Sequence, residues 1–388
     1  MIYSPLGDFL ESGHAAGNVI MTETSVDGAA RPQIRRLQSD DAQFQFFPEN
    51  NQLKSLDARG HVRVDYEKKP VRAAGSSVEK FHTESENMQA AFELKERESA
   101  VRSVSQWGKF RYRDDSRTAT AGRCDYDAHK AILVLSESPL IVSRETGSTS
   151  GELVEYDQRQ KLLLVHKRVR SKLAANGGAF FGASTSSPSI ITADELQYWM
   201  ENQRARYSGS VQLLSENGQL QSRELEIFGA GTQVEARGDV VHLVPIPEAS
   251  GTAENRQPQT EAKKARNSEN VPMIIRSSQL RYLKEKNSIT YTGNVTLRSR
   301  DVNLSSASLD AVLDKQGKRI ERATAKGKVA IRQGARECKG EIADYYLDPG
   351  KFVVTGEPAE IYDPGKGRSF ARRLTSFTTD DRILIEDQ

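Results

Sequence analysis

In the stretch Asn287-Ser-Ile-Thr-Tyr-Thr-Gly-Asn-Val-Thr-Leu-Arg298, apolar residues occupy alternate positions on either side of a central glycine. Ile289, Tyr291, Val295 and Leu297 alternate with polar residues, which is typical of a β-strand with one buried face. Glycine in the middle of a strand costs about 0.5–1 kcal/mol relative to alanine. The pattern therefore predicts a half-buried strand with a special requirement at its centre.

The same arrangement recurs along the whole chain. A small or aromatic residue, a glycine and then a β-branched or aromatic residue two positions later are found around Gly17, Gly60, Gly108, Gly209, Gly238, Gly293 and Gly327. One such glycine would indicate a bulge or a close backbone approach. Repetition at one register instead indicates that every unit bends, or leaves out a side chain, at a fixed point. The alternative is that these are ordinary hairpin glycines.

Around these strands the order of parts also repeats. An aromatic strand, a polar turn and a glycine strand follow one another in residues 192–213 and again in residues 276–297. Self-similarity over a few tens of residues is the mark of a repeat architecture. With no long amphipathic helix in the sequence, we predict an all-β array of antiparallel hairpins.

One segment differs in composition from the rest. Residues 248–272 are polar, contain proline, glycine and lysine, and have neither aromatic residues nor periodicity. Such composition is typical of a disordered linker. We therefore predict a β-array over residues 1–247, a linker over 248–272 and a second array over 273–388.

The composition limits the class of protein. With 388 residues, 37% hydrophobic content, 28% charged residues and a net charge of +2, the chain has the balance of a soluble protein. It contains no apolar run near the roughly 20 residues that a membrane helix needs. No secretory signal is visible, yet a glycine strand is already complete by Met21. We therefore expect the natural protein to begin upstream.

The two cysteines lie far apart in the sequence. Cys124 and Cys338 each occupy an alternating position, which favours two buried small hydrophobic residues in separate strands. A single long-range disulfide between them remains the alternative.

The sequence shows no arrangement typical of catalysis. There is no metal-ligand spacing, no phosphate-binding loop and no nucleophile elbow, so we predict neither an enzyme, a cofactor nor a metal site. Basic residues accumulate beside the last glycine strands, but they alternate with apolar positions and have acidic neighbours. We predict that they form a solvated outer face and do not bind nucleic acid, with contact to anionic headgroups as the less favoured alternative: Arg298, Arg300, Lys326, Lys328, Arg332, Arg336 and Lys339.

Three blocks of the C-terminal part resemble a known family. They begin at Arg281, Ala325 and Gly340, and in this order they resemble the OstA-like domain of the lipopolysaccharide-transport proteins LptA, LptC and LptD. The resemblance is clear over residues 273–386 and looser over 13–245. It implies an open, twisted β-jellyroll of stacked antiparallel hairpins whose groove carries the acyl chains of lipopolysaccharide across the periplasm. The length of the chain and the segment 248–272 suggest a fusion of LptC-like or tandem LptA-like modules.

The resemblance also implies partners and a site. The expected partners are lipopolysaccharide, LptC-like and LptD-like proteins, and further copies of the chain joined head to tail. Strand parity then predicts the residues that face the lipid groove: Ile289, Tyr291, Val295, Leu297, Val302, Leu304, Val329, Ile331, Ile342, Phe352 and Val354, with Tyr207, Val211 and Leu213 upstream. Burying a chain of about a dozen carbons is worth roughly 0.8 kcal/mol per methylene, which requires a long apolar groove. The alternative function is a structural β-solenoid or an adhesin-like scaffold without lipid cargo.

Overall fold

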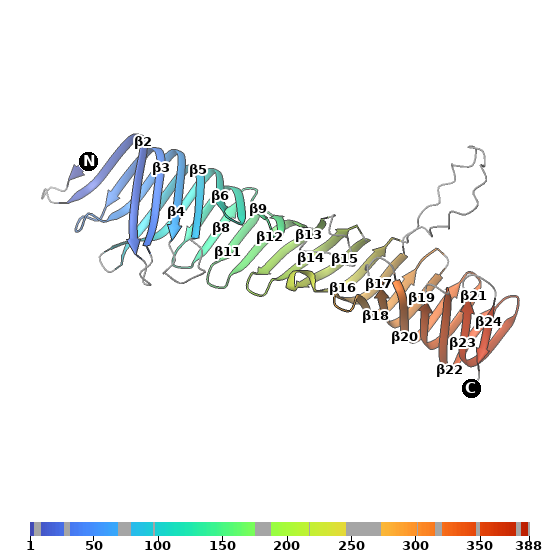
Figure 1. Cartoon of the computed structure of the whole chain (residues 1–388). Coiled ribbons are helices and arrows are strands. Elements are labelled where there is room, and N and C mark those ends of the chain that lie inside the picture. The colour runs from blue at the N-terminus through green and yellow to red at the C-terminus, as the bar shows by residue number, and fades with distance from the viewer. Residues whose placement is uncertain are drawn as a thin grey trace, which may run out of the picture. The chain divides into compact units, whose positions relative to one another are not determined.

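The computed structural model describes residues 1–3, 9–26, 32–68, 79–95, 98–174, 188–216, 218–245, 273–300, 302–314, 320–346, 350–377 and 382–386. Antiparallel strands dominate these residues (Figure 1). The chain divides into two compact units. Unit 1 comprises Met1–Gly177 with Ala193–Ala205, and unit 2 comprises Gly178–Thr192 with Arg206–Gln388. The division falls within β13 (Ser189–Trp199) and β14 (Arg204–Ser215).

Unit 1 begins with a two-residue strand and six longer strands, which pair in sequence order. They are β1 (Ile2–Tyr3), β2 (Leu10–Val26), β3 (Pro32–Phe46), β4 (Leu53–Lys68), β5 (Glu79–Lys95), β6 (Glu98–Asp114) and β7 (Arg117–Asp127). Shorter strands follow: β8 (Ile132–Ser136), β9 (Leu140–Ser143), β10 (Gly147–Ser150), β11 (Leu153–Asp157) and β12 (Leu162–Leu173). Because β7 pairs with both β8 and β9, these two short strands together take the place of one long strand.

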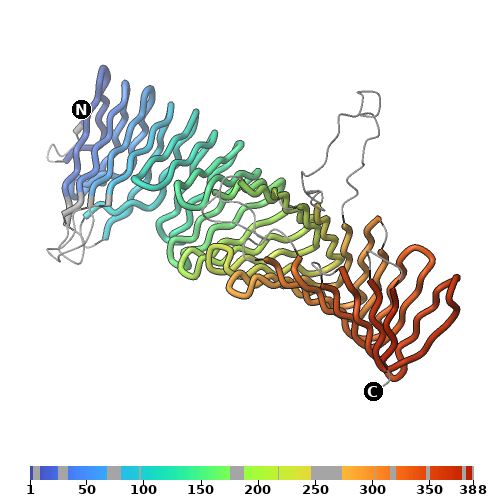
Figure 2. The backbone as a smooth tube through the Cα atoms, turned by 45° about the vertical axis from the view of Figure 1, so that its right-hand side comes forward, coloured from blue at the N-terminus to red at the C-terminus, as the bar shows by residue number. Residues whose placement is uncertain are grey.

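Unit 2 continues the same sequential pairing from β15 to β24. Its strands are β15 (Gly218–Phe228), β16 (Gln233–Val244), β17 (Met273–Leu283), β18 (Ser288–Arg298), β19 (Val302–Leu313), β20 (Ile320–Gln333), β21 (Arg336–Tyr346), β22 (Lys351–Asp363), β23 (Gly367–Phe377) and β24 (Ile383–Glu386). A 3₁₀ turn, Gly229–Gly231, joins β15 to β16. Figure 2 follows the backbone from strand to strand.

The predicted linker, residues 248–272, lies outside the described residues. The strands on either side of it, β16 and β17, pair directly with each other from Val244↔Met273 to Gln233↔Leu283. Both strands belong to unit 2. The domain boundaries drawn from the sequence stay a prediction, but the sheet continues across the segment.

The seven predicted glycines share one backbone conformation. All have positive φ, between 72° and 99°, as at Gly60 (72°), Gly293 (81°) and Gly209 (99°). L-residues with a Cβ rarely adopt this region, so glycine is the residue that fits. The pairing register shifts at the same place in neighbouring strands, for example between Thr292 and Val295. The prediction that the strands bend at a fixed point is thus supported, and we call these points glycine corners.

In β2–β6 and again in β14–β20, strands with glycine corners alternate with strands that turn at a buried serine. In each serine corner the hydroxyl donates to the carbonyl oxygen two residues later, as from Ser85 to Asn87 at 2.9 Å and from Ser277 to Gln279 at 2.9 Å. The same bond occurs at Ser39, Ser222 and Ser306. The residue after the serine occupies the space that the neighbouring glycine leaves, since a Cβ on Gly327 would lie 2.8 Å from the Cβ of Ala307. The two corner types therefore interlock.

Serine corners also change strand parity. In β19 the buried residues are Leu304 and Ser306 before the corner, but Leu309, Ala311 and Leu313 after it. In β18, which has a glycine corner, the inward residues stay at odd positions throughout. The structure is all-β and consistent with the predicted jellyroll of stacked antiparallel hairpins. The described residues contain no helix that is long and apolar enough to cross a membrane.

Candidate functional site

The interior of unit 2 is lined by cross-strand rows of apolar side chains. The corner divides each strand into two arms, so unit 2 has two half-sheets, which we name after Tyr291 and Leu297. The Leu297 half-sheet carries the row Leu220, His242, Ile275, Leu297, Leu304, Ile331, Cys338 and Ile361. The Tyr291 half-sheet carries the row Leu225, Ala236, Leu280, Tyr291, Leu309, Ala325, Ala343, Val354 and Leu374.

Most of the predicted groove residues lie in or beside these rows. Ile289 and Phe352 belong to a parallel row of the Tyr291 half-sheet, while Val295 and Val329 lie beside the glycine corners. Leu297 and Val302 are half-buried. The others on the inward face are buried, with exposures of 0–9%: Ile289, Tyr291, Val295, Leu304, Val329, Ile331, Phe352, Val354, Tyr207, Val211 and Leu213. Their contact with lipid stays a prediction.

Ile342 lies on the wrong face for a groove residue. It is 38% exposed and pairs with Lys326 and Thr355, whereas its neighbour Ala343 is buried. The register shifts between Lys339 and Ile342, so the parity of β21 changes there. Parity counted from the start of the strand therefore assigns Ile342 to the wrong face.

A hydrogen bond crosses the interior between the two half-sheets. The imidazole Nδ1 of His242, on β16, lies 2.7 Å from the hydroxyl of Tyr291, on β18. Both side chains are buried, and their ring centroids are 6.1 Å apart. Burial lowers the pKa of His242 to about 4 and raises the pKa of Tyr291. Both groups are therefore neutral near pH 7, and we call this pair the inner clasp.

A second polar contact crosses the interior near the end of unit 2. The Arg336 guanidinium donates to Asp363 Oδ2 at 2.9 Å within the Leu297 half-sheet, and to Ser376 Oγ at 3.0 Å on the opposite half-sheet. The Arg336 and Asp363 side chains are only 11% and 16% exposed. The hydrogen bond from Arg336 holds the pKa of Asp363 below its usual value. We call these three residues the rim clasp.

The structure corrects the predicted position of Arg336 and shows an interior residue, His242, that was not predicted. Arg336 was expected on the solvated outer face, but it follows the Gly334 turn and shares the parity of the buried Cys338. The alternation of Arg336 with Cys338 along β21 could have shown from the sequence that Arg336 faces inward. His242 could have been placed on the inward face of β16 in the same way, because it is two positions after Val240. Cys124 and Cys338 are both free and buried, as predicted.

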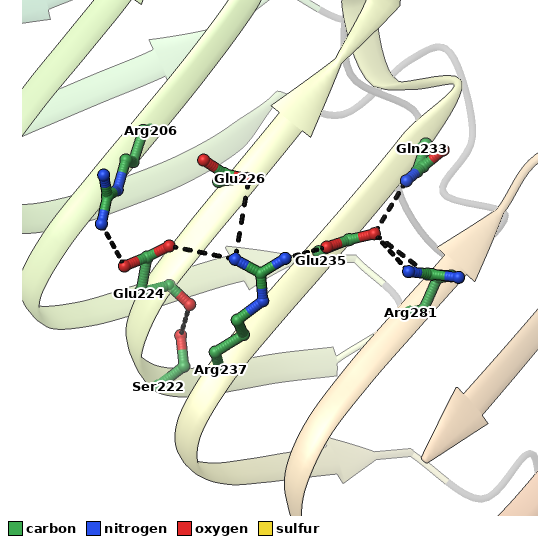
Figure 3. Close-up of polar contacts among 8 residues, drawn as sticks. All are labelled: Arg206, Ser222, Glu224, Glu226, Gln233, Glu235, Arg237 and Arg281. Atoms are coloured by element: carbon green, nitrogen blue, oxygen red, sulfur yellow. Dashed lines mark hydrogen bonds and ion pairs between the residues drawn. The ribbon is translucent and has the colours of Figure 1, made fainter. Parts of the chain in front are cut away.

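The outer face of unit 2 carries a network of charges across β14 to β17 (Figure 3). Arg237 contacts Glu224, Glu226 and Glu235 at 3.5, 4.0 and 2.5 Å. Arg206 and Arg281 complete the network, at 2.6 Å from Glu224 and 2.9 Å from Glu235. Glu226 and Glu235, which are both buried, are directly paired across two strands, so the arginines offset a repulsion between like charges. The network joins strands on both sides of residues 246–272.

The interior of unit 1 is built from the same kind of rows but with smaller and more polar side chains. One row contains Ala15, Ala42, Ala58, Met88, Gln106 and Cys124. On the facing arms, Leu37 and Thr83 are buried, whereas Met21, Val64 and Tyr112 of the same row are only half-buried. Tyr66 stacks on Phe81 at a centroid distance of 4.7 Å, and Phe81 packs against Tyr112 in a tilted arrangement at 5.5 Å. Apolar surface therefore stays partly accessible in unit 1.

The described residues contain no cluster of three or more histidine, cysteine or acidic side chains that could hold a metal ion. What the interior of each unit offers is a continuous apolar lining with isolated polar contacts. Such a lining suits a hydrophobic ligand or simple packing.

Part of the C-terminal array matches a known family, in agreement with the resemblance seen in the sequence. Comparison with curated proteins gives no match. One solved structure that matches is LptH from Pseudomonas aeruginosa, described as the LptA-homologous periplasmic component of the conserved lipopolysaccharide transport device. It is 14% identical, covers 30% of this chain and 83% of its own, and gives a TM-score of 0.28. Residues 274–380 match the family model of the LptA/LptD N-terminal domain of lipopolysaccharide transport proteins. Over these residues the chain is thus similar to the LptA/LptD N-terminal domain, which is the resemblance that its motifs predicted.

Proposed function

We propose that the chain is a periplasmic bridge protein that carries lipopolysaccharide from the inner to the outer membrane along its apolar interior. The observation that carries this proposal is the uninterrupted pairing of the two inward rows, from β15 to β22 in the Leu297 half-sheet and from β15 to β23 in the Tyr291 half-sheet. An acyl chain lying across neighbouring strands would keep one apolar lining along its whole length. The match of residues 274–380 to a lipopolysaccharide-transport family supports the same function.

A photo-crosslinking residue tests the cargo and its path. Placed at Val295 or Ile331, which are buried on the inward face, it should capture lipopolysaccharide in cells. Placed at Thr296 or Arg332, on the opposite face, it should not. Equal capture on both faces would contradict the assignment of the interior as the path. Absence of any acylated lipid from repeated preparations would contradict lipid carriage itself.

We also propose that the C-terminal edge joins a neighbouring OstA-like domain, either an LptC-like or LptD-like partner or another copy of the chain. Within the described residues, β24 pairs with β23 through Arg373↔Glu386 to Ser376↔Ile383. Leu384 and Ile385 are 49% and 52% exposed. An exposed apolar edge strand readily accepts another strand. Removing residues 382–388 should abolish oligomers or partner capture in light scattering, and unchanged association would show that the joint lies elsewhere.

A structural scaffold without cargo is the second candidate, and one observation favours it. Most inward side chains of unit 2 already fill the space between the half-sheets, as the exposures of 0–9% at residues such as Val295 and Ile331 indicate. A scaffold would have the same packing. Captured lipid at Val295 would decide for the bridge, and persistent failure at both inward positions would decide for the scaffold.

A further inference from the structure

The tight packing of unit 2 raises a question about access. A ligand can enter an interior lined by buried side chains only if the two half-sheets separate. Apolar contacts between the half-sheets are non-directional, so an acyl chain can replace them at little cost. Hydrogen bonds between buried groups behave differently, because parting them leaves polar atoms without partners in an apolar medium.

The two clasps are bonds of this second kind. The inner clasp joins His242 to Tyr291 across the interior at 2.7 Å, although the two residues are 49 positions apart in the chain. The rim clasp joins Arg336 to Ser376 at 3.0 Å, and Asp363 fixes the guanidinium in place at 2.9 Å. Between them, on β19 and β20, the two inward rows consist of Leu304, Leu309, Ala325 and Ile331.

We infer that the inner clasp and the rim clasp hold the half-sheets of unit 2 closed, and that an acyl chain enters the interior there only when these bonds part. The inference rests on the proposed function, and it adds the residues that control access to the path. Ala236 on β16 and Tyr291 on β18 lie in the same row of the Tyr291 half-sheet, with Leu280 of β17 between them. In the rim clasp, Asp363 pairs with Arg336 whether or not Ser376 is engaged, so opening there leaves no isolated charge.

The test compares the full chain with three variants, using cis-parinaric acid as the probe because its fluorescence rises in an apolar site. Tyr291→Phe keeps the ring and removes the hydroxyl of the inner clasp. Ser376→Ala removes the acceptor of the rim clasp with little change in volume. Tyr362→Phe, on the outer face and 40% exposed, is the matched control.

Losing one hydrogen bond should shift the equilibrium between closed and open interiors by about fivefold. We expect uptake of the probe to accelerate by about that factor in Tyr291→Phe and Ser376→Ala, and to stay unchanged in Tyr362→Phe. Hydrogen exchange without probe should also accelerate in β17–β19 for Tyr291→Phe and in β21–β23 for Ser376→Ala.

The possible failures are distinct. If the native chain takes up the probe and both clasp variants match its rate, the inference is overturned while the proposed function stands. Faster exchange with unchanged uptake would show that the clasps stiffen the unit but do not control access. If no form of the chain takes up the probe, lipid carriage fails, and control of access fails with it. Should Tyr291→Phe not fold, the Ser376→Ala result alone decides.

Discussion

The interiors of the two units follow one plan with different side chains. In unit 1 the row through Ala42 and Ala58 is lined by small residues, and the facing Met21 and Val64 remain half-buried. In unit 2 the Tyr291 half-sheet also carries larger residues, such as Leu280 and Tyr291, and each of these is only 1% exposed. The difference teaches that the backbone plan alone does not decide whether the interior is accessible. Side-chain size and a few polar contacts across it decide that.

The largest expected difference between the units comes from removing one inward leucine. Leu280→Ala in unit 2 should lower the free energy of unfolding by about 2–5 kcal/mol, because the closed interior leaves a cavity. Leu53→Ala in unit 1 should have a clearly smaller effect, since Leu53 is half-buried and solvent can fill the gap. Chemical denaturation followed by hydrogen exchange in each unit measures both effects. Equal losses would mean that the interior of unit 1 is as closed as that of unit 2.

Acid should destabilise unit 2 selectively through His242. Its pKa is about 4 in the folded chain and near 6.5 when exposed, so the unfolded chain binds the extra proton first. The stabilisation is complete above pH 6.5 and is lost as the pH falls toward 4, by about 3 kcal/mol in total. Thermal unfolding between pH 7 and pH 4 measures this loss. A His242→Gln variant, which does not titrate, should show a shallower pH dependence, and an identical slope would assign the loss to other groups.

The charge network of unit 2 should contribute more to stability than an exposed ion pair beside a glycine corner of unit 1. Arg237→Ala leaves the buried Glu226 and Glu235 facing each other, and should cost about 2 kcal/mol in unfolding free energy. Lys109→Ala removes an exposed ion pair with Glu86 and should change stability little. Urea denaturation of both variants, at low and high salt, provides the comparison. Similar costs for the two would show that the carboxylates are better hydrated than their exposures indicate.

The smallest expected difference concerns the glycine corners themselves. Gly17→Ala and Gly327→Ala both force a Cβ into the positive-φ region, at a cost of about 1–2 kcal/mol each. At Gly17 nothing lies within 4 Å of that Cβ, whereas at Gly327 the Cβ of Ala307 lies at 2.8 Å. The unit 2 variant should therefore unfold at the lower temperature. If the Gly17→Ala variant unfolds at the lower temperature instead, the backbone of β19 must shift at Ala307 to make room for the new Cβ.

The sequence predicted the corners well because their cause is local. A positive φ at the middle of a strand needs glycine, so the requirement is visible at Gly60 or Gly293 without any knowledge of the neighbouring strands. Glycine corners preserve parity, which is why Val295 and Ile331 were placed on the inward face from alternation alone. These features need only the chain itself.

The errors arose where two strands act together. At a serine corner the inward positions change from even to odd, or the reverse, and this change is set by pairing with a neighbour. In β21 the inward positions change in the same way beside Gly340, where the strand has no serine, so parity placed Ile342 on the wrong face. Parity also could not show that Arg336 reaches across to Ser376. Contacts between half-sheets, such as His242 with Tyr291, depend on how two arms face each other. Alternation within one strand contains no information about that.

The interlocking of the corners sets a rule for growth. Gly60, Gly108 and Gly327 each leave room for the middle residue of the preceding serine corner, at Asp40, Glu86 and Ala307. A single added strand would place two glycine corners or two serine corners side by side, and the fit would be lost. Gene duplication can therefore lengthen such a protein only by whole hairpins, so its reach increases in steps of two strands.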